Sequence, residues 1–152
     1  MVAMRDEGLI GAVGLSNVTA EEYETAKAIT EVACIQNAYN LADRSDQALV
    51  DACAADGVAY VPFFPLGSAF RPDKPVLTAP AVVATANRLG ATTAQVALAW
   101  LLQQAPNLLL IPGTSSLGGR ATGRLRPSGG SRGTITERLW GSWPVRTLTA
   151  SS

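Results

Sequence analysis

Residues 10–17 read IGAVGLSN, an apolar run relieved only by glycine that ends in two polar residues. Such a run is typical of a strand covered on both faces of a parallel sheet, here residues 10–15. Thr19 and Glu22 follow with the spacing of a capping box, in which a hydroxyl and a carboxylate satisfy free backbone N–H groups at the start of a helix. The stretch therefore predicts a strand followed by a helix over residues 19–30.

The same alternation of apolar runs and capped helices continues to residue 111. Ser45 and Thr92 are the expected N-caps, and Gly57 and Gly90 are expected to end helices in the left-handed conformation. Four strands joined by helices require parallel pairing and right-handed crossovers. The residues thus predict an α/β fold and leave open an open doubly wound sheet or part of a (β/α)8 barrel. The further strands are expected at residues 32–36, 58–63 and 108–111, and the further helices at 45–56, 80–90 and 92–104.

The composition excludes several classes of chemistry. The chain has 152 residues, 47% of them apolar, and no histidine, which excludes zinc sites, Ser-His triads and general bases that depend on histidine. Cys34 and Cys53 have neither the spacing of a metal knuckle nor that of a disulfide framework. The start, MVAMRDEGLI, carries an acidic pair where a signal peptide needs an apolar run, and the run 96–102 is too short to cross a bilayer. We therefore expect a reduced, cytoplasmic, soluble protein with no membrane segment and no metal site.

The charge is balanced overall but divided between two regions. Residues 1–117 carry 6 basic against 11 acidic side chains, whereas residues 118–152 carry 6 arginines against the single Glu137. A uniformly basic nucleic-acid binder is thereby excluded, and no nucleic-acid partner is expected. The second region is rich in Gly, Arg, Ser and Pro and has no apolar stripe wide enough to bury. We expect an ordered domain over residues 1–117 and a disordered tail over residues 118–152.

Four loops follow the predicted strands, at the end of a parallel α/β fold where ligands bind. They offer amides, hydroxyls, aromatic rings and glycine-rich backbone, but no strong acid, base or nucleophile, which predicts binding more than catalysis. Gly8, Gly11 and Gly14 have the spacing GxxGxxG instead of GxGxxG, and they run into the predicted strand 10–15 instead of opening a helix. They therefore do not form a Rossmann dinucleotide fingerprint. The four loops contain residues 16–17, 36–37, 63–68 and 112–116.

Five strings in the chain, by their order and spacing, resemble the second half of the aldo/keto reductase family. The strings are GAVGLSN, IQNAYNLADR, VPFFPLGS, TTAQVALAWLLQQ and IPGTSS. The resemblance covers about residues 2–117 and implies the C-terminal half of a (β/α)8 TIM barrel, with the four predicted strands as barrel strands five to eight. It also implies an oxidoreductase that binds NADP(H) without a Rossmann motif, which agrees with the missing fingerprint.

The resemblance assigns cofactor-binding roles to residues of all four loops. Ser16, Asn17 and Gln36 match the family residues that hydrogen-bond the nicotinamide carboxamide, a group that presents both a donor and an acceptor. Phe63 matches the position whose ring, often that of tyrosine, stacks on the nicotinamide. The family loop over the pyrophosphate is matched by Leu66, Gly67 and Ser68, and the loop that holds the 2′-phosphate of the adenosine ribose by Gly113, Thr114 and Ser115.

The chain departs from the family pattern in two places. The family's catalytic Asp, Tyr, Lys and His lie on its first four strands, and Tyr23, Tyr39 and Tyr60 match other positions, so no catalytic residue is assigned. After SSLG, the family's Glu-Asn pair is replaced by sequence that includes Arg120, which receives no phosphate-binding role. The loss of resemblance near Leu117 leads to the hypothesis of a frameshift, and the start inside the helix before strand five to that of an internal start or a truncated gene.

We therefore expect a fragment of an NADP(H)-dependent aldo/keto reductase that keeps the cofactor-binding loops, lacks the catalytic set and is inactive alone. Two alternatives stay open: a non-catalytic nucleotide-binding or interaction module, and a truncated gene product without function. A small-molecule carbonyl substrate is expected only if the barrel is completed. Half a barrel has unpaired edges at residues 10–15 and 108–111, which favour self-association.

Overall fold

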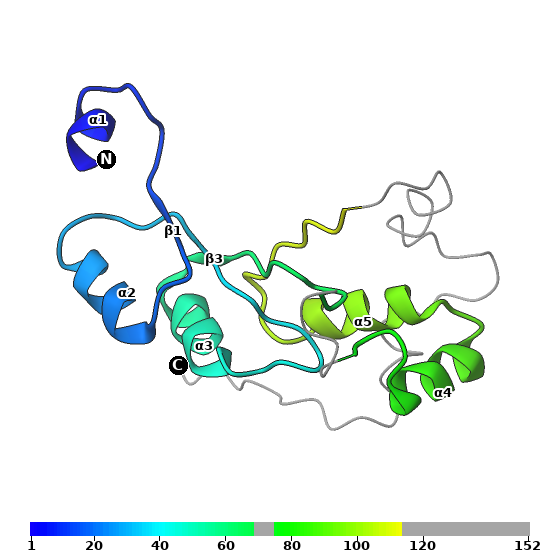
Figure 1. Ribbon diagram of the computed structural model, residues 1–152. Coiled ribbons are helices and arrows are strands. Elements are labelled where there is room, and N and C mark those ends of the chain that lie inside the picture. Colours follow the sequence, from blue (N-terminus) through cyan, green and yellow to red (C-terminus); the bar gives the residue numbers. More distant parts are fainter. Residues whose placement is uncertain (69–74, 114–152) are drawn as a thin grey trace, which may run out of the picture.

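The computed structural model describes residues 1–68 and 75–113, and its centre is a parallel three-stranded sheet (Figure 1). The strands lie across the sheet in chain order, so each is hydrogen-bonded to the next strand in the sequence. The predicted tail and the predicted boundary at residue 117 lie outside the described residues. The strands are β1 (Gly14–Ser16), β2 (Cys34–Gln36) and β3 (Ala59–Tyr60).

Two helices connect these strands and make the pairing parallel. Helix α2 (Ala20–Lys27) joins β1 to β2, and α3 (Gln47–Asp56) joins β2 to β3. Both lie on the same side of the sheet (Figure 1). Leu15 is in register with Ile35, and Ile35 with Tyr60. The predicted α/β class is thus confirmed as a parallel β/α arrangement.

The chain after β3 forms a pair of packed helices and then returns to the sheet. These are α4 (Pro80–Leu89) and α5 (Thr93–Leu102). The expected strand 108–111 is wrong as a full strand: Leu108 forms a single parallel bridge with Tyr60. The adjacent backbone N–H of residue 109 donates to the Tyr60 carbonyl over 2.9 Å. This segment therefore pairs with β3 at one position instead of along its length.

Local signals placed most helix ends correctly. Thr19 and Glu22 form the predicted capping box, with the Thr19 N–H donating to the Glu22 carboxylate over 2.7 Å and the Glu22 N–H donating to the Thr19 hydroxyl over 3.2 Å. Thr92 caps α5 in the same way. Gly57 and Gly90 end α3 and α4 with φ of 71° and 61°, in the region that glycine enters without steric cost.

Several predicted details are wrong. The strands expected at residues 32–36 and 58–63 are shorter, since β2 and β3 cover only 34–36 and 59–60. The first strand is shorter than residues 10–15, because pairing with β2 begins only where the Val13 carbonyl accepts from the Ala33 N–H. The N-cap of α3 is Asp46 instead of Ser45, whose hydroxyl donates to Asp43. The helix predicted over residues 19–30 is shorter, since α2 ends at Lys27, and Ile29 beyond its end is 67% exposed.

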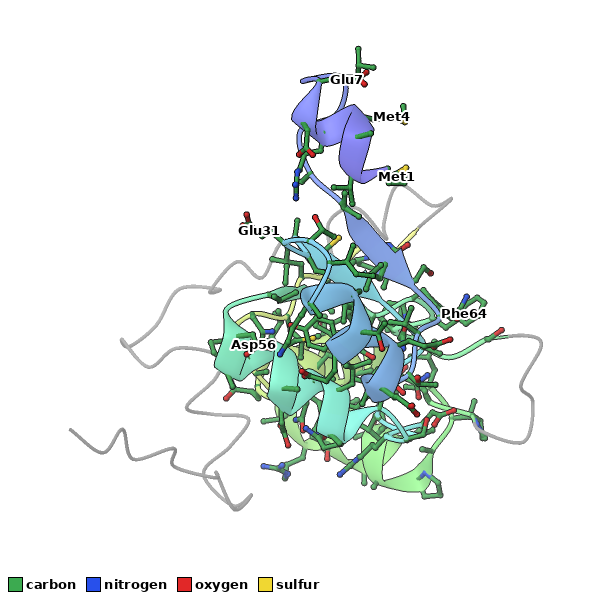
Figure 2. All side chains as sticks on the ribbon, turned by 90° about the vertical axis from the view of Figure 1, so that its left-hand side faces the viewer. Met1, Met4, Glu7, Glu31, Asp56 and Phe64 are labelled. Carbon is green, nitrogen blue, oxygen red and sulfur yellow. The ribbon has the colours of Figure 1, made fainter. Side chains whose placement is uncertain are left out.

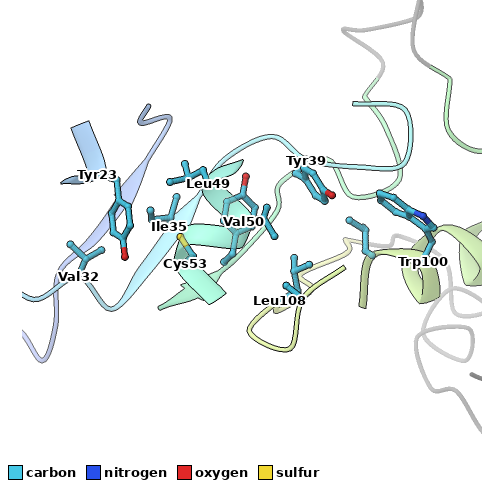
Figure 3. Close-up of a cluster of buried hydrophobic side chains, with 12 residues drawn as sticks. Tyr23, Val32, Ile35, Tyr39, Leu49, Val50, Cys53, Trp100 and Leu108 are labelled. Carbon is cyan, nitrogen blue, oxygen red and sulfur yellow. The ribbon is translucent and has the colours of Figure 1, made fainter. Parts of the chain in front are cut away.

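The main core lies between the sheet and the helices. It extends from Tyr23 at one end to Trp100 at the other (Figure 3). Tyr39 stacks on Trp100 with ring centroids 6.0 Å apart and meets Tyr60 edge-on at 6.1 Å. Aromatic pairs of this geometry contribute about 0.5–1.5 kcal/mol each beyond area burial. A smaller cluster between α4 and α5 contains Val82, Ala86, Val96 and Ala99.

A short N-terminal helix, α1 (Val2–Asp6), lies apart from the sheet (Figure 1). None of its residues is buried, and the Arg5 guanidinium reaches back to donate a hydrogen bond to the Thr30 hydroxyl. Across the described residues, no helix has both the length and the apolar character needed to span a membrane.

Candidate functional site at the carboxyl ends of the strands

The two faces of the sheet have different environments. Side chains alternate between the faces along a strand. Ile35 and Tyr60 belong to the core cluster packed against α3. Ser16 and Gln36 are in register with each other on the opposite face, where Ser16 is exposed and Gln36 half-buried. Because parallel strands end at the same edge of a sheet, the structure brings these two predicted site residues together at the ends of β1 and β2.

Asn17 joins this pair through the backbone. The Gln36 carbonyl accepts hydrogen bonds from the Ser16 hydroxyl over 2.8 Å and from the Asn17 N–H over 3.2 Å. Asn17 has a φ of 54°, a left-handed conformation that asparagine adopts more readily than most residues. Among the described residues, the side-chain amides of Asn17 and Gln36 have no hydrogen-bond partner. Each amide therefore has a donor and an acceptor free for a ligand.

Phe63 extends the same face beyond β3. Its N–H donates to the Asn37 carbonyl over 3.0 Å, and it forms a parallel bridge with Ala38. This bridge continues the register of β2 and β3, and Ala38 lies two residues beyond Gln36, so Phe63 occupies the face that carries Gln36. The Phe63 ring meets that of Phe64 edge-on, with centroids 5.2 Å apart. An aromatic ring thus lies on the sheet face that carries the Gln36 amide.

The loop after Phe63 turns tightly at Gly67. Its N–H donates to the Phe64 carbonyl over 2.9 Å, and its φ is 89°. A Cβ at this position would lie 3.3 Å from the Val76 Cγ2 atom, so both the conformation and the space favour glycine. Leu66 and Ser68 are half-buried on either side of it.

The fourth predicted loop is described only in part. Gly113 is exposed at the end of the described chain. The predicted site residues Thr114 and Ser115 lie outside the described residues. The structure therefore brings together residues of the first three loops and does not place this last pair.

Three residues to which the sequence analysis assigned no role connect the loops from the buried side, although one of them, Asn37, lies in a predicted loop. Asn37 and Asn40 are only 5% and 6% exposed, and the side-chain oxygen and nitrogen of each have hydrogen-bond partners. The Asp46 carboxylate accepts from Asn37 and from the Tyr60 hydroxyl. The two asparagines stand in the stretch QNAYN, where polar residues directly after a buried strand were the available signal.

The three tyrosines all donate to groups inside the fold. Tyr23 donates to Asp56 over 2.9 Å, Tyr60 donates to Asp46 over 2.9 Å, and Tyr39 donates to the side-chain oxygen of Gln47. Burial raises the pKa of Tyr39 to about 12. Burial, reinforced by the hydrogen bonds to carboxylates, raises the pKa values of the Tyr23 and Tyr60 phenols above their usual range. These hydroxyls are therefore poor proton donors to a bound ligand.

A Tyr-Lys-Asp cluster does form, but at the other end of the sheet. The Lys27 ammonium lies 2.6 Å from the Asp56 carboxylate and over the Tyr23 ring at 4.9 Å. Asp56 is the last residue of α3, three positions before β3 begins at Ala59, so the cluster lies at the amino ends of the strands. Figure 2 shows Asp56 and Phe64 on opposite sides of the molecule. The hydrogen bond between them raises the pKa of Lys27 and lowers that of Asp56. Residues at this end of a parallel β/α fold serve stability instead of catalysis.

Metal-ligating groups are sparse in the described part of the chain. No three His, Cys, Asp or Glu side chains gather there in a way that could hold a metal ion. Both Cys34 and Cys53 are free thiols. Burial raises the pKa of the Cys53 thiol to about 11, which keeps it protonated and inert.

Comparison with known proteins identifies the family. The family model for aldo/keto reductases matches residues 1–119, and the chain belongs to the aldo/keto reductase family. It is 53% identical over 117 residues to pyridoxine 4-dehydrogenase of Escherichia coli, and 37% identical over 119 residues to an uncharacterized oxidoreductase of Schizosaccharomyces pombe. These matches cover 77% of this chain but 39% and 37% of the relatives, so the chain spans about two fifths of their length.

Solved structures give the same result. An aldo/keto reductase from Klebsiella pneumoniae, crystallised with NADP and acetate, superposes with a TM-score of 0.69 at 28% identity. A second structure from the same organism, crystallised with NADPH, superposes with a TM-score of 0.67. The superpositions cover 80% and 78% of this chain and 44% and 43% of those chains. The described β/α units are therefore consistent with the TIM-barrel fold of this oxidoreductase family.

Proposed function

We propose that the chain is the cofactor-binding half of an NADP(H)-dependent aldo/keto reductase. It corresponds in this proposal to strands five to eight of the barrel and does not reduce carbonyls alone. The observation that carries it is the convergence of Ser16, Asn17 and Gln36 at one edge of the sheet, with two side-chain amides that have no partner among the described residues. Relatives crystallised with NADP or NADPH support the choice of cofactor.

The chemistry of these side chains suits a nicotinamide. Its carboxamide needs both donors and acceptors, which the amides of Asn17 and Gln36 supply. Phe63, on the same face, gives the nicotinamide ring a stacking partner and leaves its other face open to a small-molecule carbonyl substrate. When bound, NADPH supplies the hydride for carbonyl reduction. In this assignment Leu66, Gly67 and Ser68 hold the pyrophosphate.

The adenosine end of the cofactor is assigned to the fourth loop, residues 112–116. The proposal assigns the 2′-phosphate to the segment Gly113–Ser115, where backbone N–H groups and hydroxyls are suitable donors for phosphate oxygens. Carbonyl reduction also needs a proton at the carbonyl oxygen, a contribution of ~10²- to 10⁴-fold to the rate. The three phenols of this chain are engaged inside the fold, which supports a donor outside this chain.

Completion of the barrel tests this proposal. The full chain is assayed alone and together with the segment of the Escherichia coli relative that it does not span, with pyridoxine and NADP as probes. We expect no turnover by either piece and turnover by the mixture. A mixture carrying Tyr39→Phe in this chain is the matched control and should keep its turnover. Turnover by this chain alone, or an inactive mixture that also fails to bind NADPH, would overturn the proposal.

We also propose that the chain self-associates through its strand edges. In the described part of the chain, β1 pairs with β2 alone, and Leu109 and Ile111 next to the other edge are each 55% exposed. Unpaired backbone groups beside exposed apolar side chains favour pairing between chains. Light scattering should show a dimer or larger species, and Leu109→Lys should shift it toward monomer. A wild-type chain that is monomeric and melts cooperatively contradicts this proposal.

A further inference from the structure

We propose that Asn37 and Asn40 are positioning residues for the nicotinamide, and that Asp46 aligns Asn37. They hold the loops on either side of Gln36 so that Asn17 and Phe63 reach the same ligand. This inference rests on the proposed function of the Ser16, Asn17 and Gln36 cluster.

Asn37 attaches the loop after β1 to the end of β2. Its side-chain oxygen accepts from the Val18 N–H over 3.1 Å, and its side-chain nitrogen donates to the Val18 carbonyl over 2.7 Å. The Asn37 side chain thereby bonds to both backbone groups of Val18, as a paired strand would, beyond the end of β1 at Ser16. Val18 directly follows Asn17, so this two-point contact fixes the direction in which the Asn17 amide leaves the sheet.

Asp46 fixes the orientation of the Asn37 amide. Its Oδ2 atom accepts from the Asn37 side-chain nitrogen over 2.6 Å and from the Tyr60 hydroxyl over 2.9 Å. A carboxylate only accepts, so the nitrogen of the amide must face Asp46 and the oxygen must face Val18. Asp46 occupies the N-cap of α3 without a capping hydrogen bond. An aspartate at this position usually caps its own helix, and here its carboxylate is used instead to orient Asn37.

Asn40 attaches the loop after β3 from the other side. Its side-chain nitrogen donates to the Phe64 carbonyl over 3.1 Å, and its oxygen accepts from the N–H groups of Ala42 and Asp43, both over 2.9 Å. Phe64 has a φ of 54°, a conformation that is costly for a bulky residue and persists where surrounding contacts over-determine it. Since Phe64 follows Phe63 directly, the bond from Asn40 sets where the Phe63 ring stands.

The two asparagines therefore act on opposite sides of Gln36. Buried amides are unfavourable unless their polar atoms are hydrogen-bonded, and here both the nitrogen and the oxygen of each have partners. The ligand-facing residues come from three different strands, which have no covalent connection near the site. Bonds of this kind between loops are what places Asn17, Gln36 and Phe63 around one ring.

The test compares two nucleotides on the full 152-residue chain. NADPH includes the nicotinamide, whereas adenosine 2′,5′-bisphosphate retains only the end bound by the other loops. Asn37→Asp removes the donor to Val18 and faces Asp46 with a second acceptor, and Asn40→Asp removes the donor to Phe64. We expect each to weaken NADPH binding about 10-fold, the loss of one well-oriented hydrogen bond, with adenosine 2′,5′-bisphosphate binding unchanged. Asn87→Asp, an exposed position on α4, is the matched control and should change neither.

Each outcome of this comparison decides the inference. If Asn37→Asp does not fold, Asp46→Ala replaces it, because it leaves the Asn37 contact with Val18 and removes the carboxylate that aligns Asn37, together with the acceptor of the Tyr60 hydroxyl. About 3-fold weaker NADPH binding is then expected. Equal losses for both nucleotides would show a merely structural role and overturn the inference, as would unchanged binding of NADPH. A wild-type chain that binds NADPH no more tightly than the bisphosphate would instead contradict the proposed nicotinamide site itself.

Discussion

The two ends of the parallel sheet both carry polar side chains, but the Tyr23 cluster at the amino end and the Asn17 and Gln36 amides at the carboxyl end differ in whether they have hydrogen-bond partners within the fold. At the amino end, Tyr23 and Lys27 both donate hydrogen bonds to Asp56, so these three side chains have partners within the fold. At the carboxyl end, the amides of Asn17 and Gln36 have no partner among the described residues. A polar group whose bonds are complete stabilises the fold, whereas a group held in place with free bonding capacity is available to a ligand. Substitutions should therefore affect stability at one end and binding at the other.

The largest effect is expected at the amino end, from Tyr23→Ala. Tyr23 is fully buried, and removal of a buried aromatic side chain costs about 3–5 kcal/mol of unfolding free energy. Tyr23→Phe loses only the bond to Asp56 and should cost about 1 kcal/mol. Urea denaturation measures both, with Thr25→Ala on the exposed face of α2 as control. Equal midpoints for Tyr23→Ala and the control would contradict a structural role for this cluster.

The converse result is expected at the carboxyl end, from Gln36→Ala. It should weaken NADPH binding about 10-fold and leave the unfolding free energy within about 0.5 kcal/mol of wild type, because its amide is not bonded inside the described fold. NADPH fluorescence titration and urea denaturation on the same preparation separate the two effects. Gln103→Ala, at the exposed end of α5, is the matched control. A large loss of stability in Gln36→Ala would remove the distinction between the two ends.

The sequence predicted what depends on residues close together in the chain. The Thr19 capping box, the left-handed Gly57 and the convergence of Ser16 with Gln36 follow from local spacing and from parallel register. The cap of α3 was misplaced because Ser45 and Asp46 are both favourable capping residues, and tertiary bonds decide between them.

Contacts between distant segments were beyond local reasoning. Asn40 acts on Phe64, 24 residues away, and no spacing rule connects them. The apolar run at residues 108–111 has the composition of a strand, but composition does not tell whether a neighbour pairs along its full length. The family resemblance assigned roles to the loops. The hydrogen bonds that hold those loops in place, such as that from Asn40 to Phe64, were visible only in the structure.

The smallest effect on stability is expected from the Lys27–Asp56 pair, and it depends on pH. The hydrogen bond from Lys27, followed by that from Tyr23, holds the pKa of the Asp56 carboxyl below its usual value. A carboxyl whose pKa is depressed by folding stabilises the native state above its unfolded pKa, about 3.9, and this contribution is lost as pH falls through the folded value. Asp56→Asn should therefore lower Tm by a few degrees at pH 7 and by much less at pH 3.

Added salt and the substitution of a second carboxylate on α3 test whether the effect of Asp56→Asn on Tm comes from its charge. Both side chains of the pair are about one third exposed, so salt should screen the attraction and reduce the Tm difference at pH 7. Asp51→Asn is the matched control, because Asp51 lies on the same helix and its exposed carboxylate is not bonded to Lys27. Thermal melts from pH 3 to pH 8 measure both variants. A Tm difference for Asp56→Asn that persists unchanged at pH 3 would mean that its hydrogen-bond geometry, and not its charge, stabilises this end of the sheet.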